Sequence, residues 1–442
     1  MKPQKRIWGL ALSSLGAIAL LAGCASGDKK DEGVESGDAA AEVGSSGETL
    51  EFWGWNPAYE SMVNEWNATH ERQVKFELTA SGSAGGYTRM QAAVTAGNAP
   101  CLAQFGNESI TSFVVEGMME DITDAMKPYE DGYDDSVLAS VRVGDGLYGV
   151  PVDTAPMGMY YRTDVYEEAG LEPATTWDEF QEQARAFHEA NPDKYLTSWD
   201  APSSGFWGSL TQQAGGTWFS IDGDSWVVEV DSPITEKLAD YWQVMMDDDL
   251  VRQIESDSPE WWDELQQGLI ATEFQPVWWA TILEGAAEQT EGLWAVAPMP
   301  NWEEGVATNG TAGGSATVVL SGCNDIEGAV EFANWMSTDD EAIRILIDEA
   351  SAFPASKVGM ENPAISMEKP FFDNQRILDV FAETVGDIQT EWAYGPVNTQ
   401  TGASFRDSMT AASDGKETLR EGLAKAQVAF VKDLEAKGLS VK

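Results

Sequence analysis

Short strand patterns alternate with amphipathic helix patterns from Thr49 onward, and this alternation constrains the fold more than any other feature of the sequence. Three segments have strand patterns: residues 50–53, residues 74–78, and residues 101–105 directly after Pro100. Between them lie two segments whose apolar residues recur at helical spacing, namely Tyr59, Met62, Val63 and Trp66, and then Tyr87, Met90 and Val94. This order predicts an α/β fold with helices on both faces of a parallel sheet.

Similar patterns continue in the second half of the chain. Thr176 and Glu179 have the spacing of a capping box, which predicts a helix that begins there and ends before Asn191 and Pro192. Residues 294–297 and 316–320 have strand patterns. Helical spacing is also found at Ile326, Ala329, Val330 and Ala333, and at Leu419, Leu423, Phe430 and Leu434. At 442 residues the chain exceeds what one hydrophobic core usually serves, so two lobes are expected.

The N-terminal segment has the layout of an export signal. A basic start precedes a continuous apolar stretch over residues 7–22, and small residues then lead to Cys24. Because this ending is similar to a bacterial lipoprotein processing site, we expect residues 1–23 to be removed as a signal peptide and Cys24 to carry lipid. A membrane-spanning helix is the alternative, but the stretch is shorter than the ~20 residues that a span requires. Acyl chains would hold the protein at the membrane surface without spanning the bilayer.

Residues 24–48 are expected to form a flexible linker between the lipid and the folded part. The segment is dominated by Gly, Ser, Ala and charged residues and contains no aromatic residue. Such a composition buries too little apolar surface to fold. The folded part is therefore expected outside the cytoplasm, in contact with the cell membrane through its anchor alone.

Acidic residues outnumber basic residues by 74 to 26, which gives a formal net charge of -48. A surface of this kind repels nucleic acid and anionic bilayers, so neither is an expected partner. Solubility or adaptation to a saline habitat explains the acidity without a specific cation site. The two histidines, His70 and His188, have no metal-ligand spacing, and no metal site is predicted.

Two cysteines, Cys101 and Cys323, remain besides Cys24. In an exported protein two such thiols are expected to form a disulfide, with free buried thiols as the alternative. A glycine-rich stretch over residues 82–86 lacks the Lys and the spacing of a phosphate-binding loop, and it is predicted to be a turn.

From Thr49 to the C-terminus, the order of segments resembles the extracellular solute-binding proteins of ABC transporters (family 1), in the maltose- and oligosaccharide-binding branch. Each segment is weakly specific alone, but their order and spacing together are specific. The segments are LEFWGW at 50–55, AVTAGNAP at 93–100, GLYGVPVDT at 146–154, MYYRTD at 159–164, AGL at 169–171, TWDEF at 176–180, APMP at 297–300, GGS at 313–315 and FPAS at 353–356.

The resemblance implies a two-lobed periplasmic-binding-protein-like fold of type II. Each lobe would be a mostly parallel sheet flanked by helices, and crossing strands would form the hinge. We expect the N-terminal lobe to comprise residues 49–153 and 306–350, and the C-terminal lobe to comprise residues 154–305 and 351–442. The chain departs from many relatives at Cys101, where they have Asp, and at Arg162, where they have Asn. The change at Cys101 fits a disulfide to Cys323.

Candidate ligand contacts include aromatic side chains, because a sugar presents flat C–H faces to its binding site. Successive side chains diverge along a regular element, so at least one of two adjacent Trp residues is expected to be exposed. Core packing is the alternative for each aromatic residue. The candidates are Trp55 in the first loop, Trp207, the adjacent pair Trp278 and Trp279, and Trp392 with Tyr394.

Candidate polar contacts follow strands, where ligands bind in open α/β sheets. Asn56 follows the first strand, Asn107 and Glu108 follow the third, and Asp153 lies where the chain is expected to cross between lobes. The resemblance implies sugar contacts at Glu108 and Asp153, with solvated surface as the alternative. Gly313 and Gly314 would let backbone amides approach a ligand, with a plain turn as the alternative.

The resemblance implies a monomeric, non-catalytic receptor without cofactor, which closes on a mono- or oligosaccharide and delivers it to ABC permease subunits. A secreted glycoside hydrolase is the alternative, since such enzymes also use Trp platforms and paired acids. A surface adhesin would be expected to show repeats or β-rich patterning, which the sequence lacks. Residues 55–58 lack the charged residues that maltose-type relatives present, so the sequence leaves the identity of the sugar open.

Overall fold

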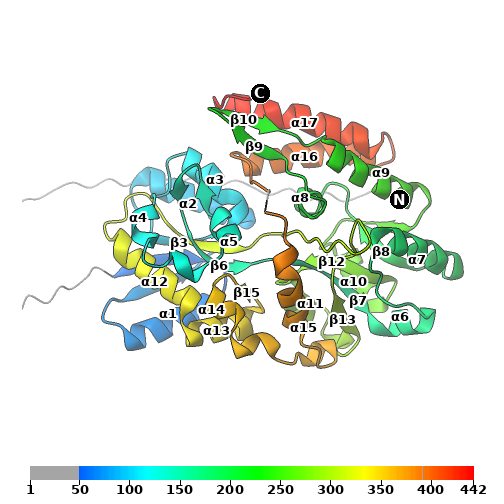
Figure 1. Ribbon diagram of the computed structural model, residues 1–442, viewed down its shortest axis with the longest axis horizontal. Helices are drawn as coiled ribbons and strands as arrows, with labels where there is room; N and C mark the ends of the chain where they lie inside the picture. The colour runs from blue at the N-terminus through cyan, green and yellow to red at the C-terminus, as the bar shows by residue number, and fades with distance from the viewer. Residues whose placement is uncertain (1–48, 391) are drawn as a thin grey trace, which may run out of the picture. The chain divides into compact units, whose positions relative to one another are not determined.

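The computed structural model describes residues 49–390 and 392–442. The predicted signal peptide, the lipid site at Cys24 and the linker lie outside the described residues. The described chain forms two lobes, each built on its own mixed sheet with helices packed against it (Figure 1). The two-lobed α/β fold predicted from the sequence is therefore confirmed.

The first sheet has six strands in the order β15-β6-β14-β3-β1-β2. Its strands are β1 (Leu50–Gly54), β2 (Val74–Leu78), β3 (Leu102–Gly106), β6 (Val150–Thr154), β14 (Ser315–Val319) and β15 (Phe353–Pro354). A separate two-stranded hairpin of β4 (Arg142–Val143) and β5 (Gly146–Leu147) directly precedes β6 in the sequence. The helices of this lobe are α1 (Ala58–Thr69), α2 (Tyr87–Ala96), α3 (Asn107–Val115), α4 (Thr123–Met126), α5 (Asp135–Ala139), α12 (Ile326–Thr338), α13 (Asp340–Ala350) and α14 (Lys357–Met360).

The second sheet has five strands in the order β11-β8-β12-β7-β13. Its strands are β7 (Met157–Arg162), β8 (Tyr195–Trp199), β11 (Val251–Gln253), β12 (Ile270–Pro276) and β13 (Trp294–Ala297). A separate hairpin is formed by β9 (Phe219–Asp222) and β10 (Ser225–Val228). The remaining helices are α6 (Thr163–Ala169), α7 (Trp177–Ala190), α8 (Ser204–Gln213), α9 (Pro233–Asp247), α10 (Pro259–Gln267), α11 (Trp279–Ala286), α15 (Ile377–Thr384), α16 (Asn398–Ser413) and α17 (Leu419–Ala436).

The helix patterns of the sequence correspond to buried helix faces. In α1 the side chains at the predicted apolar positions, Tyr59, Met62, Val63 and Trp66, are all buried. The Thr176 hydroxyl caps α7 by accepting a hydrogen bond from the Glu179 backbone N–H, as predicted. The Glu179 carboxylate, however, accepts from the backbone of Thr175 rather than Thr176, so the reciprocal bond is shifted by one residue.

Both sheets are mixed, whereas the sequence and the resemblance predicted mostly parallel sheets. In the first sheet, β1 pairs in parallel with β2 and β3, but β14 runs antiparallel to β3 and β6. In the second sheet, β8 pairs in parallel with β11 and β12, but β7 runs antiparallel to β12 and β13. The antiparallel strands are those next to the crossings, because a chain that enters a lobe from its neighbour need not run in the direction set by local strand-helix-strand units.

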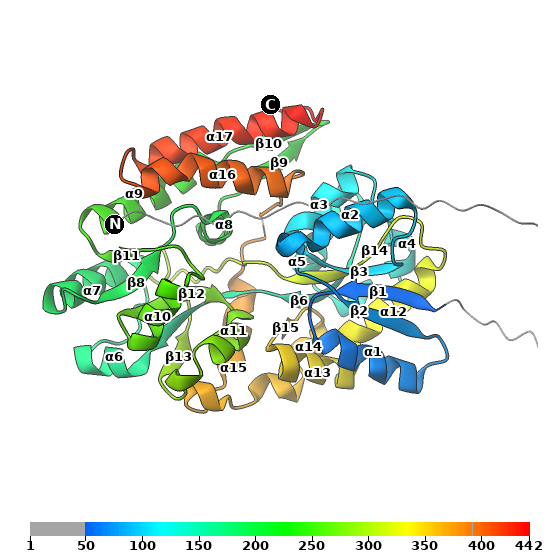
Figure 2. The same cartoon turned by 180° about the vertical axis from the view of Figure 1, so that it is seen from behind.

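The chain passes between the two sheets more than once. Only Ala155 and Pro156 separate β6 of the first sheet from β7 of the second, and the chain returns between β13 and β14. Figure 2 shows the same arrangement from behind, and both views place β6 between the two groups of helices. Neither lobe is a continuous stretch of the sequence as a result.

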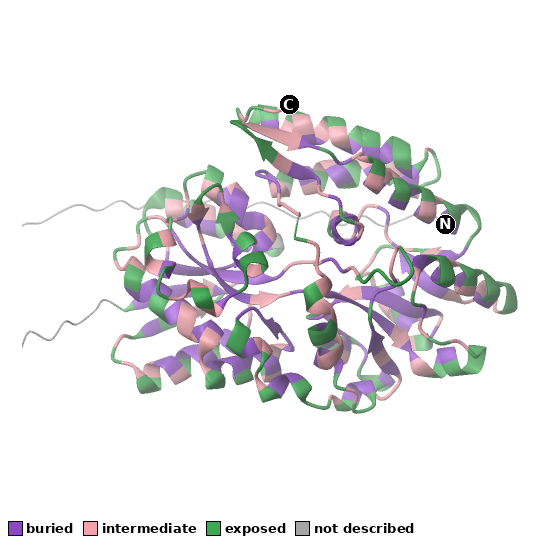
Figure 3. Cartoon of the chain, viewed as in Figure 1, coloured by how far each residue is buried: buried purple, intermediate pink, exposed green. Residues whose placement is uncertain are grey.

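Buried residues line the inner faces of the elements and exposed residues cover the outer helix faces (Figure 3). One hydrophobic cluster belongs to the first sheet and its helices, and two others pack on the second sheet. Of the residues described, no helix is long and apolar enough to cross a membrane. Within the same ranges, no group of three or more His, Cys, Asp or Glu side chains is placed to hold a metal ion.

Cys101 and Cys323 lie together at one end of the first sheet. Cys101 immediately precedes β3 and Cys323 follows β14, and these two strands are antiparallel neighbours. The two Cα atoms are 4.7 Å apart, which is within the range that disulfides span.

Candidate functional site

A cavity of about 840 Å³ is lined by residues of both sheets and their helices. A second cavity of about 540 Å³ shares part of its lining, including Asp153, Thr311 and Trp392. Because they share these residues, we describe the two adjoining cavities together as the main cleft. Its combined size is ample for a ligand of several rings, since small-molecule sites commonly measure about 300 to 1,000 Å³.

The structure brings most of the residues predicted to contact a ligand to this cleft. The larger cavity is lined by Trp55, Asn56, Glu108, Asp153, Trp278, Gly313, Gly314, Trp392 and Tyr394. Asn107 lines the adjoining smaller cavity and is buried. Most of these residues lie at or beside the ends of strands, and these ends face the same space. Trp392 and Tyr394 instead come from the segment before α16.

Trp207 and Trp279 were expected at the cleft but lie in the hydrophobic core. Trp207 is fully buried on the inner side of α8, and its indole N–H donates to the Ala201 carbonyl oxygen at 2.9 Å. Trp279 is 2 % exposed and packs against Tyr160, with ring centroids 5.0 Å apart. For these two residues the core-packing alternative describes the structure.

Trp278 and Trp279 have opposite environments because α11 begins between them. Trp278 occupies the position before the first helical residue, and its side chain is 38 % exposed at the cleft. Its indole N–H donates to the Ala312 carbonyl oxygen at 2.9 Å, which fixes the ring as part of the wall. The adjacent pair thus supplies one cleft residue and one core residue, as the divergence of successive side chains requires.

Aromatic planes line the cleft from both lobes. Trp55 follows β1 and meets Tyr87 edge to face, with ring centroids 5.9 Å apart. The backbone N–H of Trp55 donates to the Gln104 side-chain oxygen at 2.9 Å, which holds the first loop against β3. From the second lobe, Trp392 packs against Trp218, with centroids 5.7 Å apart. Flat C–H faces of a ligand between these planes would be desolvated on two sides.

Asp153 lies at the end of β6, directly before the first crossing. Its two carboxylate oxygens accept hydrogen bonds from the backbone N–H and the hydroxyl of Ser315, at 2.9 and 2.5 Å. Burial raises the pKa of Asp153 to about 6, against the opposing effect of the Ser315 hydrogen bonds. Much of the hydrogen-bonding capacity of this carboxylate is therefore used within the protein.

Glu108 stands in the first turn of α3 and faces the cleft from the first lobe. Its Oε1 accepts hydrogen bonds from the Tyr87 hydroxyl at 3.0 Å and the Ser109 hydroxyl at 3.3 Å. The Glu108 carboxyl group also interacts with its own backbone N–H. Burial raises the pKa of Glu108, opposed by these hydrogen bonds. Glu108 is therefore a carboxyl group that lines the cleft and is held in place by neighbouring hydroxyls.

Gly313 and Gly314 line the cleft directly before β14. Their φ angles of 96° and 89° lie in the left-handed region that favours glycine. A Cβ on Gly314 would lie 2.9 Å from the Asn107 side-chain nitrogen. The tight turn also brings the Gly313 carbonyl oxygen to 3.5 Å from the Tyr394 hydroxyl.

Several cleft residues were not predicted from the sequence. Tyr87 was assigned to a helix face only, and Trp218, Thr311 and Gly208 had no distinguishing local pattern. A Cβ on Gly208 would lie 3.1 Å from the Trp392 ring, so this glycine lets α8 approach the indole. The glycine-rich stretch at 82–86 also contributes to the cavity, because Gly82 lines it. The sequence predicts only a turn there.

Comparison with known proteins defines the class to which this fold and cleft belong. Residues 54–343 match the family model of the bacterial extracellular solute-binding proteins, and the chain belongs to that family. A relative from Bacillus subtilis (strain 168), an arabinooligosaccharide-binding protein, is 25% identical over 312 residues, which cover 67% of this chain and 71% of that protein.

Two solved structures show the same fold over nearly their full length. One is the ABC transporter associated binding protein from B. animalis subsp. lactis Bl-04 in complex with beta-1,6-galactobiose, with a TM-score of 0.77 and 25% identity. The other is the galacto-N-biose-/lacto-N-biose I-binding protein from Bifidobacterium longum in complex with lacto-N-biose, with a TM-score of 0.79 and 25% identity. Each comparison covers 89% of this chain, and 99% and 98% of the respective structures.

Proposed function

We propose that this protein binds a sugar or oligosaccharide in the main cleft and delivers it to the permease of an ABC importer. The observation that carries the proposal is that aromatic rings from both lobes line the cleft. Trp55 belongs to the first lobe, and Trp278 and Trp392 belong to the second. The carboxylate of Glu108, in the first turn of α3, lines the same cleft. Aromatic planes suit the C–H faces of a sugar, and a carboxylate oxygen suits its hydroxyls.

The relatives support this proposal. Those described above are named for, or hold, oligosaccharides and disaccharides. A ligand that contacts both lobes at once would favour the arrangement in which they are close, because only a ligand with different affinities for two states shifts their populations. We infer that such a shift is what the permease would detect, and that the ligand leaves chemically unchanged.

The proposal extends to the location of the protein, its membrane anchor and its disulfide. The family is extracellular, which supports a location outside the cytoplasm. We infer that Cys24 anchors a monomer to the cell membrane through lipid and that residues 24–48 tether it. We also infer that Cys101 and Cys323 form a disulfide, for which their 4.7 Å Cα separation and the oxidising compartment are the support.

A carbohydrate panel tests the proposed function. The protein is heated with and without arabino-oligosaccharides, beta-1,6-galactobiose, lacto-N-biose and other neutral saccharides, and the ligand is then recovered and analysed by chromatography. A true ligand at a hundredfold excess over its Kd stabilises the fold by about 2.7 kcal/mol, which gives a clear rise in melting temperature. Recovery of cleaved sugar would instead identify a glycoside hydrolase, and no shift with any saccharide would overturn the proposal.

A further inference from the structure

A third cavity, of about 250 Å³, lies beside the main cleft within the second lobe. It shares Gly205, Asp257, Trp278, Ile282 and Ala312 with the main cleft, so the Trp278 indole stands at the boundary between the two spaces. We call this cavity the side chamber. Its volume is far greater than the roughly 30 Å³ that one water molecule occupies in the liquid.

Glu273 is the central polar group of the side chamber. It lies on β12, is only 5 % exposed, and lines the chamber. Its Oε1 accepts hydrogen bonds from the Ser198 hydroxyl at 2.5 Å and from the Trp261 indole N–H at 3.2 Å. The Gln275 side chain and the Ser198 backbone also interact with this carboxyl group, and Gln275 lines the chamber beside it. A carboxylate has about four lone-pair sites, so a ligand hydroxyl that donates to Glu273 would help to offset the cost of its burial.

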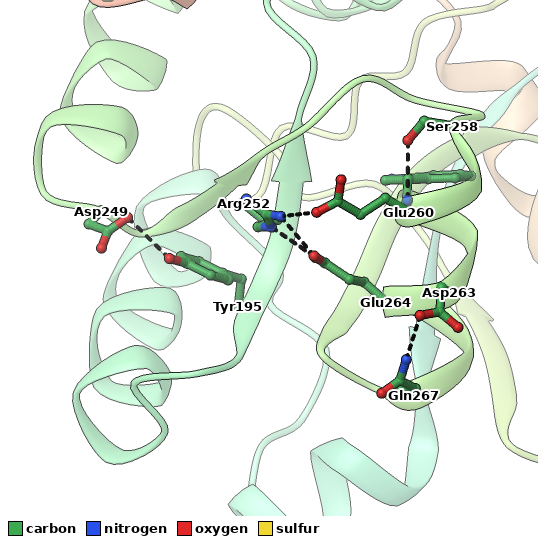
Figure 4. Close-up of polar contacts among 9 residues, drawn as sticks. Tyr195, Asp249, Arg252, Ser258, Glu260, Asp263, Glu264 and Gln267 are labelled. Carbon is green, nitrogen blue, oxygen red and sulfur yellow. Dashed lines mark hydrogen bonds and ion pairs between the residues drawn. The ribbon is translucent and has the colours of Figure 1, made fainter. Parts of the chain in front are cut away.

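The surrounding structure holds Glu273 in place. Trp261 belongs to α10, whose first turn is capped by the Ser258 hydroxyl, the acceptor of the Trp261 backbone N–H. Figure 4 shows how the same helix is fastened to the edge strand β11: the Arg252 guanidinium bridges the carboxylates of Glu260 and Glu264. A site whose groups are held in this way loses little conformational entropy when a ligand binds.

The charges of the lining define what the chamber can accept. Asp200, Asp257 and Glu273 contribute carboxyl groups, and no Lys, Arg or His side chain lines the cavity in the described ranges. Burial raises the pKa of Asp200 and of Glu273, which reflects the cost of placing negative charge there. An anionic group would be repelled, whereas neutral hydroxyl groups can donate to each carboxylate.

The apolar walls match the other faces of a sugar. Phe206, Phe274 and Trp279 line the chamber together with serine hydroxyls. This combination of aromatic planes and acceptors repeats the chemistry of the main cleft at smaller scale. Trp279, although it is buried in the core, therefore also lines the side chamber.

We propose that the side chamber binds one further, uncharged sugar unit of the saccharide held in the main cleft, with its hydroxyls donating to Glu273 and Asp200. This inference rests on the proposed function and narrows it: the ligand is a neutral oligosaccharide rather than a monosaccharide or an acidic sugar. The unit passes the Trp278 indole at the mouth of the chamber and is either a terminal residue or a branch of the ligand.

Two variants test the chamber by different means. Glu273→Gln keeps the size of the side chain and an oxygen that accepts from Ser198 and Trp261, but it removes the charge. Gly205→Leu places a side chain at the mouth, where a Cβ meets no atom within 4 Å. The matched control is Gly285→Leu on α11, which is also helical and exposed, has open space around its Cβ, and lines none of the three cavities.

Affinities for a neutral monosaccharide and for the corresponding oligosaccharides are measured by calorimetry with the mature protein and each variant. We expect the oligosaccharide to bind the unchanged protein at least tenfold more tightly than the monosaccharide. Glu273→Gln should weaken oligosaccharide binding about fivefold to tenfold, as expected for loss of a charge-assisted hydrogen bond. Gly205→Leu should remove the advantage of the longer ligand, and Gly285→Leu should change neither affinity.

The outcomes separate the two proposals. If no saccharide binds the unchanged protein, the proposed function itself is wrong. If saccharides bind but both chamber variants retain the full preference for the longer ligand, the main cleft alone binds it and the chamber proposal is overturned. Equal binding of an oligosaccharide with a terminal uronic acid would also overturn it. Melting temperatures of the unliganded variants show that each one is folded.

Discussion

Ser315 donates hydrogen bonds to both carboxylate oxygens of Asp153, through its backbone N–H to Oδ1 and its hydroxyl to Oδ2. Asp153 is the last residue but one of β6 and Ser315 is the first of β14, so this pair joins the two neighbouring strands that stand next to the crossings. The Tyr59 hydroxyl lies 3.3 Å from the Ser315 hydroxyl and extends the network into the first core. The pair therefore fixes the edge of the cleft from which the chain leaves the first lobe.

Ser315→Ala should destabilise the unliganded protein by about 1.5 to 3 kcal/mol at pH 8. The substitution leaves one oxygen of an ionised, half-buried carboxylate without its donor, and bonds to charged groups contribute about that much. The free energy of unfolding in urea measures the effect. The exposed Ser136→Ala is the matched control, and its stability should stay within about 0.5 kcal/mol of the unchanged protein. Equal effects of the two substitutions would show that the Ser315 hydroxyl contributes nothing.

Substitution of Trp278 should mainly lower saccharide affinity, whereas substitution of the adjacent Trp279 should mainly lower stability. Trp278→Ala removes an exposed ring of the cleft wall, so saccharide affinity should fall about tenfold or more while the unliganded melting temperature changes little. Trp279→Ala removes a ring that packs against Tyr160, Trp261 and Trp262, which should cost about 3 to 5 kcal/mol of stability. Calorimetry and thermal melts of both variants provide the comparison. A stable Trp279→Ala protein would contradict the packing described here.

Glu273 should make stability depend on pH. Burial raises the pKa of Glu273 from 4.5 to about 7. A carboxyl group with a higher pKa in the folded chain stabilises the fold below its unfolded pKa, and this contribution is lost as the pH rises from about 4.5 through 7. The full loss is on the order of 3 kcal/mol. Glu273→Gln lacks this titration, so relative to the unchanged protein it should gain stability between pH 5 and pH 8.

The control for this measurement is Glu288→Gln, at an exposed position. It measures the effect of replacing an exposed carboxylate by an amide over the same pH range. Urea unfolding at four or five pH values is sufficient. If the stability difference between Glu273→Gln and the unchanged protein does not change with pH, the carboxyl group of Glu273 is better solvated than its burial indicates.

Cys101 and Cys323 should be inaccessible to thiol reagents in the oxidised protein. In a Cys24→Ser background, denatured and unreduced protein should contain no titratable thiol, and reduction should release two. The loop between the cysteines is long, with a separation of 222 residues, so loss of the bond through Cys101→Ser should cost about 2 to 5 kcal/mol. Two thiols in the unreduced protein would show that the cysteines are close but not bonded.

Local elements of the fold were predictable because each helix or strand pattern reflects one buried face. The apolar spacing in α1 and the threonine cap of α7 both correspond to the structure. Strand direction was not predictable in the same way. The antiparallel placement of β14 and β7 follows from the crossings, and a crossing such as Ala155 and Pro156 leaves no compositional trace.

The site was predictable where a strand end or a sequence motif marked it, as for Glu108 and Asp153. Aromatic residues were harder, because the same residue types fill cores and line clefts. Trp207 and Trp278 both looked suitable, and only the start of α11 after Trp278 and the position of Trp207 on the inner side of α8 separate them. Tyr87 was missed since its helical spacing explained it fully, although its hydroxyl holds Glu108.

The first sheet places β14 and β15 on either side of β6, and both come from the last third of the chain. A chain that is presented from its N-terminus onward therefore cannot complete that sheet from its N-terminal half alone. The β6 edge would remain unpaired until the segment ending at Pro354 arrives. Strand order alone therefore sets how much of the chain must be present before the first sheet can be completed.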